Sequence, residues 1–186
     1  MNSKISSLSD HIILCGHWRV GGYIAAELKQ RSAQVVVIEK NPDAIKDLTE
    51  DLVVVPDATE DSVLKSAGVE RAKSLICAQD SGAANVCITH TAKEFNSNIQ
   101  ITARSESDSM DQKLLRAGAE RVVSPFRTGA QRMAITTLQP NAVDLMVMGT
   151  DDADHRALRL EEVVVTGGPA DKLERVAEAA AGMVEA

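Results

Sequence analysis

Short apolar runs alternate with stretches of helical periodicity along the first part of the chain. The run His11–Cys15 is apolar and is followed by a glycine, and Gln34–Glu39 is apolar and rich in β-branched residues. Both patterns predict buried β-strands. Between them, apolar residues recur at helical spacing over residues 20–28, which predicts an amphipathic helix.

The same alternation continues to residue 139. The further predicted strands are Leu52–Val55, Ser74–Ala78, Ile99–Ala103 and Arg121–Ser124. The further predicted helices open at Asn41–Pro42 and span Thr59–Ala67, 81–95, Asp108–Arg116 and 129–139. Gly68 and Gly118 are expected to end two of these helices.

Six buried strands that alternate with helices predict a parallel sheet with helices on both faces. Because crossovers between parallel strands are right-handed, the expected architecture is a doubly wound, Rossmann-like α/β sheet over residues 11–140. Residues 141–186 contain one predicted strand and one amphipathic helix, too little to bury their own apolar faces. They are expected to form a short α+β segment that packs on the first domain, on another subunit or on a part of the protein outside this sequence.

Composition narrows the class of protein. The chain has 186 residues, of which 44% are hydrophobic and 25% charged, as in a folded domain with its own core. No apolar run approaches the roughly 20 residues that cross a bilayer. Residues 1–140 carry 16 basic and 17 acidic side chains, and residues 141–186 carry 4 and 10. A nearly neutral body with an acidic end argues against nucleic acid as a partner, because binding phosphate backbones requires a basic face.

The cysteines and the lack of catalytic motifs narrow the class of protein further. Cys15, Cys77 and Cys87 are widely spaced, so neither a zinc site nor a disulfide framework is indicated, and all three are expected to be buried in a reducing compartment. There is no Ser/His/Asp arrangement, no HExxH motif and no Lys–Tyr pairing suited to hydride transfer. His11 and His90 are expected to be structural. We therefore expect no enzymatic activity.

The segment after the first predicted strand carries the clearest binding signal. Gly16–Gly21 (GHWRVG) follows a strand and opens a helix, which is the context of a dinucleotide-binding turn. Free backbone N–H groups at the helix start would bind an anion, and His17 is a possible ligand contact. Trp18 replaces the middle glycine of the usual motif, so its indole must swing away, shield a ligand or stack on it. A purely structural turn is the alternative.

Polar residues follow the other predicted strands. Glu39, 23 residues after Gly16, is placed to accept hydrogen bonds from both hydroxyls of an adenosine ribose, and its charge disfavours NADP; a solvated surface glutamate is the alternative. Ligands of open α/β sheets lie outside the carboxyl ends of the strands. The residues there are Asp57, Ala58, Thr59, Gln79, Asp80 and Arg104. Asp57, Thr59 and Asp80 either face a ligand or cap the next helix, and Arg104 either holds a phosphate or forms an intersubunit salt bridge.

Several segments resemble one family in the same order along the chain. They are HIILCGHWRVGGYIAAEL, VVVIEKNP, VVPDATEDSVLKSAGVERAKSLICA, ITARSES and LLRAGAERVVSPF. Together they resemble the RCK domains, regulators of potassium conductance that are also called TrkA-N or KTN domains, over residues 11–139. Its most specific parts are the Asp57 segment, the Ala67–Gly68 turn, Arg104 and the AGAE sequence before Ser124–Pro125.

The resemblance implies a cytosolic ligand-sensing module that forms homodimers and assembles into a gating ring below a potassium channel pore. It implies NAD(H) or another adenine nucleotide (ATP, ADP or AMP) as the ligand. The residues implied to contact it are Gly16, His17, Trp18, Arg19, Val20, Gly21, Glu39, Lys40, Asp57, Ala58, Thr59, Ala78, Gln79, Asp80 and Arg104. A calcium site is not expected, because only Glu106 supplies an acidic group near Arg104.

The resemblance also implies a role for each end of the chain. Residues 1–10 resemble the linker from a membrane part, which favours a channel at the inner face of the cell membrane. Residues 141–186 resemble the start of a C-terminal subdomain that is truncated or divergent, and residues 129–139 with Phe126 are implied to pair subunits. The alternatives are a peripheral Trk/Ktr-type transporter subunit, an NAD-dependent oxidoreductase, or an assembly module that binds no nucleotide.

Overall fold

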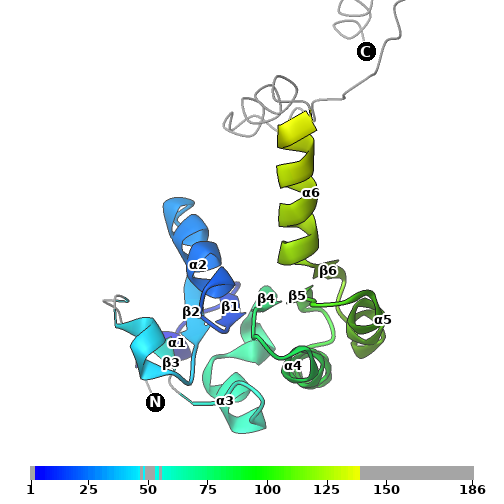
Figure 1. Ribbon diagram of the computed structural model, residues 1–186. Coiled ribbons are helices and arrows are strands. Elements are labelled where there is room, and N and C mark those ends of the chain that lie inside the picture. Colours follow the sequence, from blue (N-terminus) through cyan, green and yellow to red (C-terminus); the bar gives the residue numbers. More distant parts are fainter. Residues whose placement is uncertain (1–2, 47, 49–52, 55, 139–186) are drawn as a thin grey trace, which may run out of the picture. The chain divides into compact units, whose positions relative to one another are not determined.

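Six parallel strands form one sheet in the order β3-β2-β1-β4-β5-β6 (Figure 1). The computed structural model describes residues 3–46, 48, 53–54 and 56–138. The strands are β1 (Ile12–Cys15), β2 (Val35–Ile38), β3 (Val53–Val54), β4 (Ser74–Cys77), β5 (Gln100–Arg104) and β6 (Arg121–Val123). Each neighbouring pair is parallel, so the predicted doubly wound sheet is confirmed.

The strand order places a topological switch between β1 and β4. From β1 the chain builds outward through β2 to β3, then returns to the other side of β1 and builds outward through β4, β5 and β6. β1 pairs with β2 on one side and with β4 on the other, with Cys15 level with Ile38 and with Cys77. The carboxyl ends of these three strands therefore lie side by side, at the edge where ligands of open α/β sheets bind.

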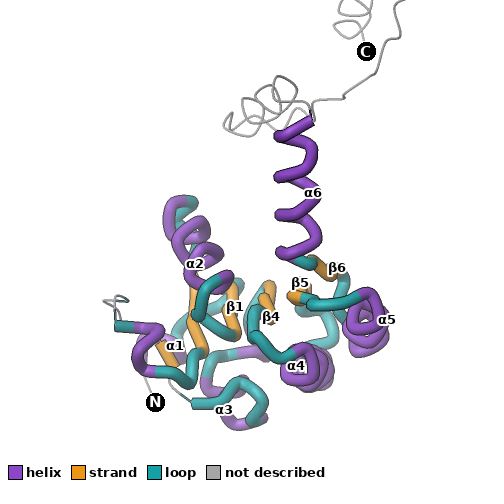
Figure 2. The backbone as a smooth tube through the Cα atoms, viewed as in Figure 1, coloured by secondary structure: helices purple, strands orange, loops and turns teal. Residues whose placement is uncertain are grey.

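Helices connect the strands, as Figure 2 shows by colour. They are α1 (Ser3–Ser6), α2 (Val20–Gln30), α3 (Asp61–Ser66), α4 (Gly82–Phe95), α5 (Asp108–Ala117) and α6 (Pro125–Leu138), with 3-10 turns η1 (Pro42–Ile45) and η2 (Val69–Arg71). Gly118 ends α5 with a φ of 110°, a conformation that favours glycine, so the predicted stop is confirmed.

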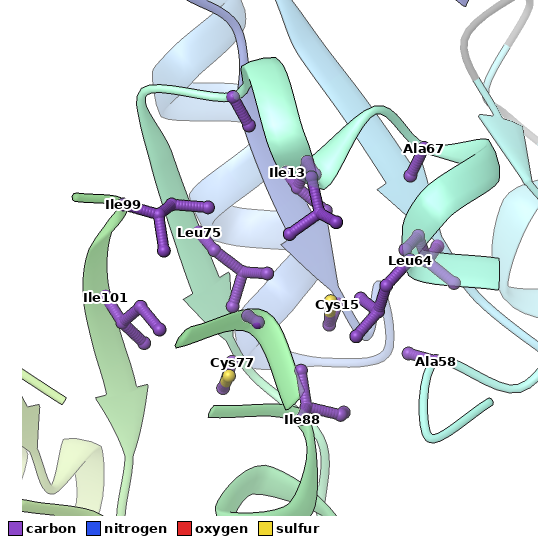
Figure 3. Close-up of a cluster of buried hydrophobic side chains, with 14 of the residues drawn as sticks. Ile13, Cys15, Ala58, Leu64, Ala67, Leu75, Cys77, Ile88, Ile99 and Ile101 are labelled. Atoms are coloured by element: carbon purple, nitrogen blue, oxygen red, sulfur yellow. The ribbon is translucent and has the colours of Figure 1, made fainter. Parts of the chain in front are cut away.

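Two apolar clusters lie on the two faces of the sheet. The larger one joins side chains of the central strands to α3, α4 and α5, and includes Leu114 of α5. Figure 3 shows Ile13, Leu75 and Ile88 in this cluster. The smaller one, built on Leu14, Val37 and Ala78, packs against α2. Successive strand residues point to opposite faces, which explains why Ile13 and Leu14 belong to different clusters.

Most boundaries differ from the prediction by one residue, and three helices differ by more. The helix expected from Asn41–Pro42 is the short turn η1, although the Asn41 side chain accepts a hydrogen bond from the Asp43 N–H at 3.0 Å, as expected of a cap. α3 starts two residues later than predicted, after Glu60. α6 begins at Pro125 instead of residue 129, because proline fits the first turn of a helix.

The N-terminal segment contains a helix that the sequence pattern did not predict. α1 places the Ile5 side chain in the larger core cluster with 2% exposure. The Arg71 Nε donates to the Leu8 carbonyl at 3.1 Å, and the Asp10 N–H donates to the Arg71 carbonyl at 2.9 Å. Part of the expected linker over residues 1–10 is therefore packed against the domain.

The cysteines are only partly as expected. Cys15 and Cys77 are fully buried, and burial raises the pKa of Cys77 to about 12. Burial also raises the pKa of Cys15, with a further contribution from Cys77. Cys87 is exposed, so its predicted burial was wrong: it lies beside Ile88 on α4 but on the solvent side of that helix.

Large apolar side chains are exposed on α6, the last described helix. Phe126 and Met133 are 67% and 73% exposed. The predicted strand and helix of residues 141–186 lie outside the described residues. Within the described part of the chain, no helix is long and apolar enough to cross a membrane.

Candidate functional site

The glycine turn between β1 and α2 is tightly packed. Gly16 has a φ of 95°, and a Cβ there would lie 3.0 Å from the Ala78 carbonyl carbon and from the Gln79 nitrogen, so a larger residue would clash with backbone. A Cβ on Gly21 would overlap the Gly16 carbonyl. Both glycines therefore permit α2 to begin directly over the turn and close to β4.

Glu39 is buried and tied to this turn. Its carboxylate is 4% exposed and accepts hydrogen bonds from the His17 N–H at 2.7 Å and from the Asn41 N–H at 2.8 Å. The solvated surface glutamate considered above is thus wrong. The turn motif predicted free backbone N–H groups, but the N–H of His17 is not free for a ligand because it donates to Glu39.

Other N–H groups of the turn remain available. Among the described residues, nothing accepts a hydrogen bond from the backbone N–H of Trp18, Arg19 or Val20. They lie at the amino end of α2, an 11-residue helix whose dipole favours negative charge. The turn keeps three donors in a geometry that suits a phosphate.

The side chains of His17 and Trp18 differ in their surroundings. The Nδ1 of His17 lies 2.7 Å from the Ala44 carbonyl, which can only accept, so Nδ1 carries the proton. This contact holds the turn against η1. Trp18 is 46% exposed, so about half of the residue is in contact with solvent.

Asp57 and Thr59 do not cap α3, which begins after Glu60 without a side-chain capping hydrogen bond; they stabilise the loop after β3 instead. Asp57 Oδ1 accepts from the Thr59 N–H at 3.0 Å and from the Thr59 hydroxyl at 2.9 Å, and Lys40 Nζ lies 3.2 Å from Asp57 Oδ2. The backbone bond from Thr59 lowers the pKa of Asp57 against the opposing effect of burial, with help from the Thr59 hydroxyl and Lys40. The Lys40–Asp57 pair joins the loops after β2 and β3 beside Glu39.

Asn85 on α4 is a site residue that the sequence analysis missed. It is 1% exposed, and its side chain bonds the Gln79 N–H at 3.1 Å, the Gln79 carbonyl at 3.1 Å and the Arg104 carbonyl at 3.0 Å. A single amide thus aligns the ends of β4 and β5. The available signal was an asparagine at helical spacing with Ile88 and Ala92 on the apolar face of the helix.

Arg104 and Asp80 lie at the far end of this edge. The Arg104 side chain is 8% exposed and forms an ion pair with Asp80 of the same chain. Asp80 does not cap α4 either: Ser81 does, accepting from the Ala84 N–H at 3.3 Å. The ring of Phe126 lies 5.7 Å from the guanidinium carbon.

The structure therefore brings most predicted residues to one edge of the sheet. Glu39 follows β2, the turn residues follow β1, the Ala78–Asp80 loop follows β4, and Arg104 is the last residue of β5. These four strands are neighbours in the sheet. Asp57 and Lys40 reach the same edge from β3 and β2, while Ala58 is buried in the core at 1% exposure. No group of three metal-ligating side chains occurs among the described residues. The arrangement offers donors for an anion and a buried acceptor for hydroxyl groups.

The chain is similar in sequence to known proteins. Residues 12–125 match the TrkA-N domain family. "Probable potassium channel protein 2" of Methanocaldococcus jannaschii is 38% identical over 151 residues, which are 78% of this chain and 44% of that protein. The chain thus spans less than half the length of this curated relative.

Solved structures share the fold. The RCK domain of GsuK superposes with a TM-score of 0.64 and 27% identity, over 74% of this chain and 30% of that one. The GsuK channel bound to NAD superposes with a TM-score of 0.57 and 26% identity, over 63% of this chain and 22% of that one.

Proposed function

The chain belongs to the TrkA-N domain family, and from that premise we propose that it is a cytosolic regulatory domain of a potassium channel that binds an adenine nucleotide. The observation that carries the proposal is the buried Glu39 carboxylate, held beside the glycine turn by two backbone N–H groups. A carboxylate in this position is suited to a ribose. The relative named as a potassium channel protein and the NAD-bound GsuK channel support the two halves of the proposal.

Glu39 can bind a ribose without losing its present partners. Each carboxylate oxygen accepts one hydrogen bond from the protein and has a further lone pair. The two hydroxyls of an adenosine ribose would donate to these positions. Because the two N–H groups already fix the carboxylate, little side-chain entropy is lost on binding.

The phosphates of the nucleotide would lie on the turn itself. The N–H groups of Trp18, Arg19 and Val20 supply donors at the start of α2, and the guanidinium of Arg104 supplies positive charge further along the edge. The exposed indole of Trp18 is free to cover the ligand. The adenine would lie near Asp57, Ala58 and Thr59, after the third strand.

A regulatory domain must also prefer one state of its assembly when the ligand binds. We propose that nucleotide binds one conformation of a homo-oligomeric ring more tightly and so biases an attached pore. A shift from 1:99 to 99:1 requires about 5.5 kcal/mol of differential binding, which several sites in a ring can share. In the alternative, a Trk/Ktr-type transporter, the same sites would act on a separate membrane protein.

Calorimetric titration with ADP, NADH and 2′-deoxy-ADP tests the nucleotide site. We expect wild type to bind ADP, and to bind 2′-deoxy-ADP about tenfold more weakly, because the buried carboxylate loses a hydroxyl donor. In Glu39→Ala this difference should vanish, which separates ribose recognition from a general effect on folding. Glu27→Gln, on the exposed end of α2, is the matched control and should behave like wild type.

Three results would contradict the proposal. The first is that wild type binds no adenine nucleotide. The second is that wild type binds ADP and 2′-deoxy-ADP equally, and the third is that Glu39→Ala still discriminates between them. Either of the last two would show that Glu39 does not bind the ribose.

A further inference from the structure

Arg104 is buried between two partners of different chemistry. Its guanidinium is 8% exposed at the end of β5 and is paired with Asp80, which is 55% exposed. On another side it lies 5.7 Å from the centroid of the Phe126 ring, in the first turn of α6. A cation this close to an aromatic ring is attracted to it.

The guanidinium is not fully satisfied by these contacts. Nε of Arg104 is buried, and no group in the described part of the chain accepts its hydrogen bond. A buried donor without an acceptor is costly, since the group has lost its water. Arg104 therefore has one strong partner, Asp80, and one buried N–H donor without an acceptor, which an anion could reach only if the side chain moved.

This cluster is continuous with the glycine turn. Gly16 packs directly on Ala78 and Gln79, and Asp80 is the next residue along the chain. Asn85 fixes the backbone at Gln79 and at Arg104. Because Asn85 holds the backbone at Gln79 and at Arg104, we expect a ligand at this edge to move mainly the side chains of Asp80 and Arg104 and the groups that they contact.

We propose that Asp80 occupies Arg104 in place of a ligand anion, and that a bound phosphate competes for the guanidinium and changes its contact with Phe126. Arg104 is then the positioning residue that connects the ligand to α6. The inference rests on the proposed nucleotide binding, and it assigns that site a specific route to α6. The physical basis is that a phosphate and the Asp80 carboxylate repel each other when both lie beside the same guanidinium, so each weakens the other's hold on Arg104.

Titration with a charged and an uncharged ligand tests the competition. We expect Asp80→Asn to bind ADP three- to tenfold more tightly than wild type, because a carboxylate no longer opposes the phosphate, and to bind adenosine unchanged. Asp61→Asn, in the exposed first turn of α3, removes the same charge away from Arg104 and should bind ADP like wild type. Arg104→Gln should weaken ADP binding about tenfold and remove the gain when it is combined with Asp80→Asn.

Fluorine NMR tests the connection to α6. The chain has two phenylalanines, so labelling with 4-fluorophenylalanine gives two signals. Phe95 packs under Lys65, 4.5 Å from its ring centroid, and serves as the internal control. We expect ADP to shift the Phe126 signal and not the Phe95 signal, and the Phe126 shift to be lost in Arg104→Gln. Phe95→Leu assigns the two signals.

The possible failures are distinguishable. If wild type binds no adenine nucleotide, both this inference and the proposed function are wrong. If wild type binds ADP but Asp80→Asn binds it no better, or binds adenosine better to the same extent, Asp80 does not compete with the ligand. If the Phe126 signal does not move on binding, Arg104 does not act on α6. In the last two cases the proposed nucleotide binding stands.

Discussion

At the scale of single residues, Arg19 in the glycine turn has a backbone conformation that residues with a side chain do not favour. Arg19 has φ 41° and ψ −100° immediately before α2, and its side chain makes no capping hydrogen bond. Residues other than glycine rarely adopt positive φ, and a strained conformation of this kind costs roughly 1–3 kcal/mol. The surrounding contacts of Gly16 and Glu39 hold the turn in place, so the strain is stored beside the candidate phosphate donors.

Replacing Arg19 tests this strain. Arg19→Gly should be more stable than Arg19→Ala by about 1 kcal/mol in the free energy of unfolding, because glycine tolerates positive φ while alanine keeps the strain. The comparison between the two variants removes the effect of losing the arginine side chain. Urea unfolding followed by circular dichroism measures it, and an alanine variant as stable as the glycine variant would show that the turn is not strained.

At the scale of elements, a charged pair joins three parts of the fold. Lys93 of α4 forms an ion pair with Glu120, in the loop before β6, and donates to the Ile99 carbonyl at 2.7 Å. Glu120 also accepts from the Ile101 N–H of β5 at 2.6 Å. The pair thus holds α4 and the loop before β6 against the start of β5.

The pH dependence of this pair can be measured. Burial alone would raise the pKa of Glu120, but the bonds from Lys93 and the Ile101 N–H outweigh it and lower the pKa. The ionised form therefore stabilises the fold above the unfolded-state pKa, and this stabilisation is lost as the pH falls through the lower folded-state pKa. At pH 7, Glu120→Gln should lower the free energy of unfolding by about 1 kcal/mol, since the group is partly exposed.

Unfolding at several pH values separates this effect from a simple packing change. The difference between wild type and Glu120→Gln should shrink as the pH falls below roughly 4.3, the usual value of a glutamate. Glu94→Gln, on the exposed side of α4, provides a control without a backbone partner. A difference that stays constant down to pH 3 would exclude the charge as its cause.

At the scale of the whole molecule, the N-terminal segment contributes to the core. α1 places Ile5 among core residues, and Arg71 holds the following chain through the Leu8 carbonyl. If another domain precedes this segment, any movement of that domain reaches the sheet through these contacts and not through a loose tether. Part of the segment expected to be a linker, residues 1–10, is therefore also part of the folded domain.

Substitution of Ile5 measures that contribution. Ile5→Ala should lower the free energy of unfolding of the full chain by about 2 to 4 kcal/mol, because it leaves a cavity under α1. Ser7→Ala, which removes only an exposed hydrogen bond to the Lys4 carbonyl, should change it by less than about 0.5 kcal/mol. Equal effects of the two substitutions would mean that the segment is not packed in solution.

The sequence alone determined the number of the strands and their succession along the chain, and hence the doubly wound class of the sheet. Apolar runs such as His11–Cys15 depend only on near neighbours, so their periodicity can be interpreted without a structure. Glu39 and the glycine turn were found in the same way, because a strand end and a following glycine are adjacent in the chain. The helix from Asn41 and the burial of Cys87 were misjudged, since helix length and the choice of buried face depend on what packs against them.

Only the tertiary structure decided which distant side chains meet. Asp80 and Arg104 are 24 residues apart, and His17 and Glu39 are 22 apart. Asn85 also joins two strand ends that no local pattern relates. These partners follow from the strand order, which brings β2, β1, β4 and β5 together at one edge. A side chain of given type can satisfy its hydrogen bonds with many partners, and only the packing of the whole sheet selects one of them.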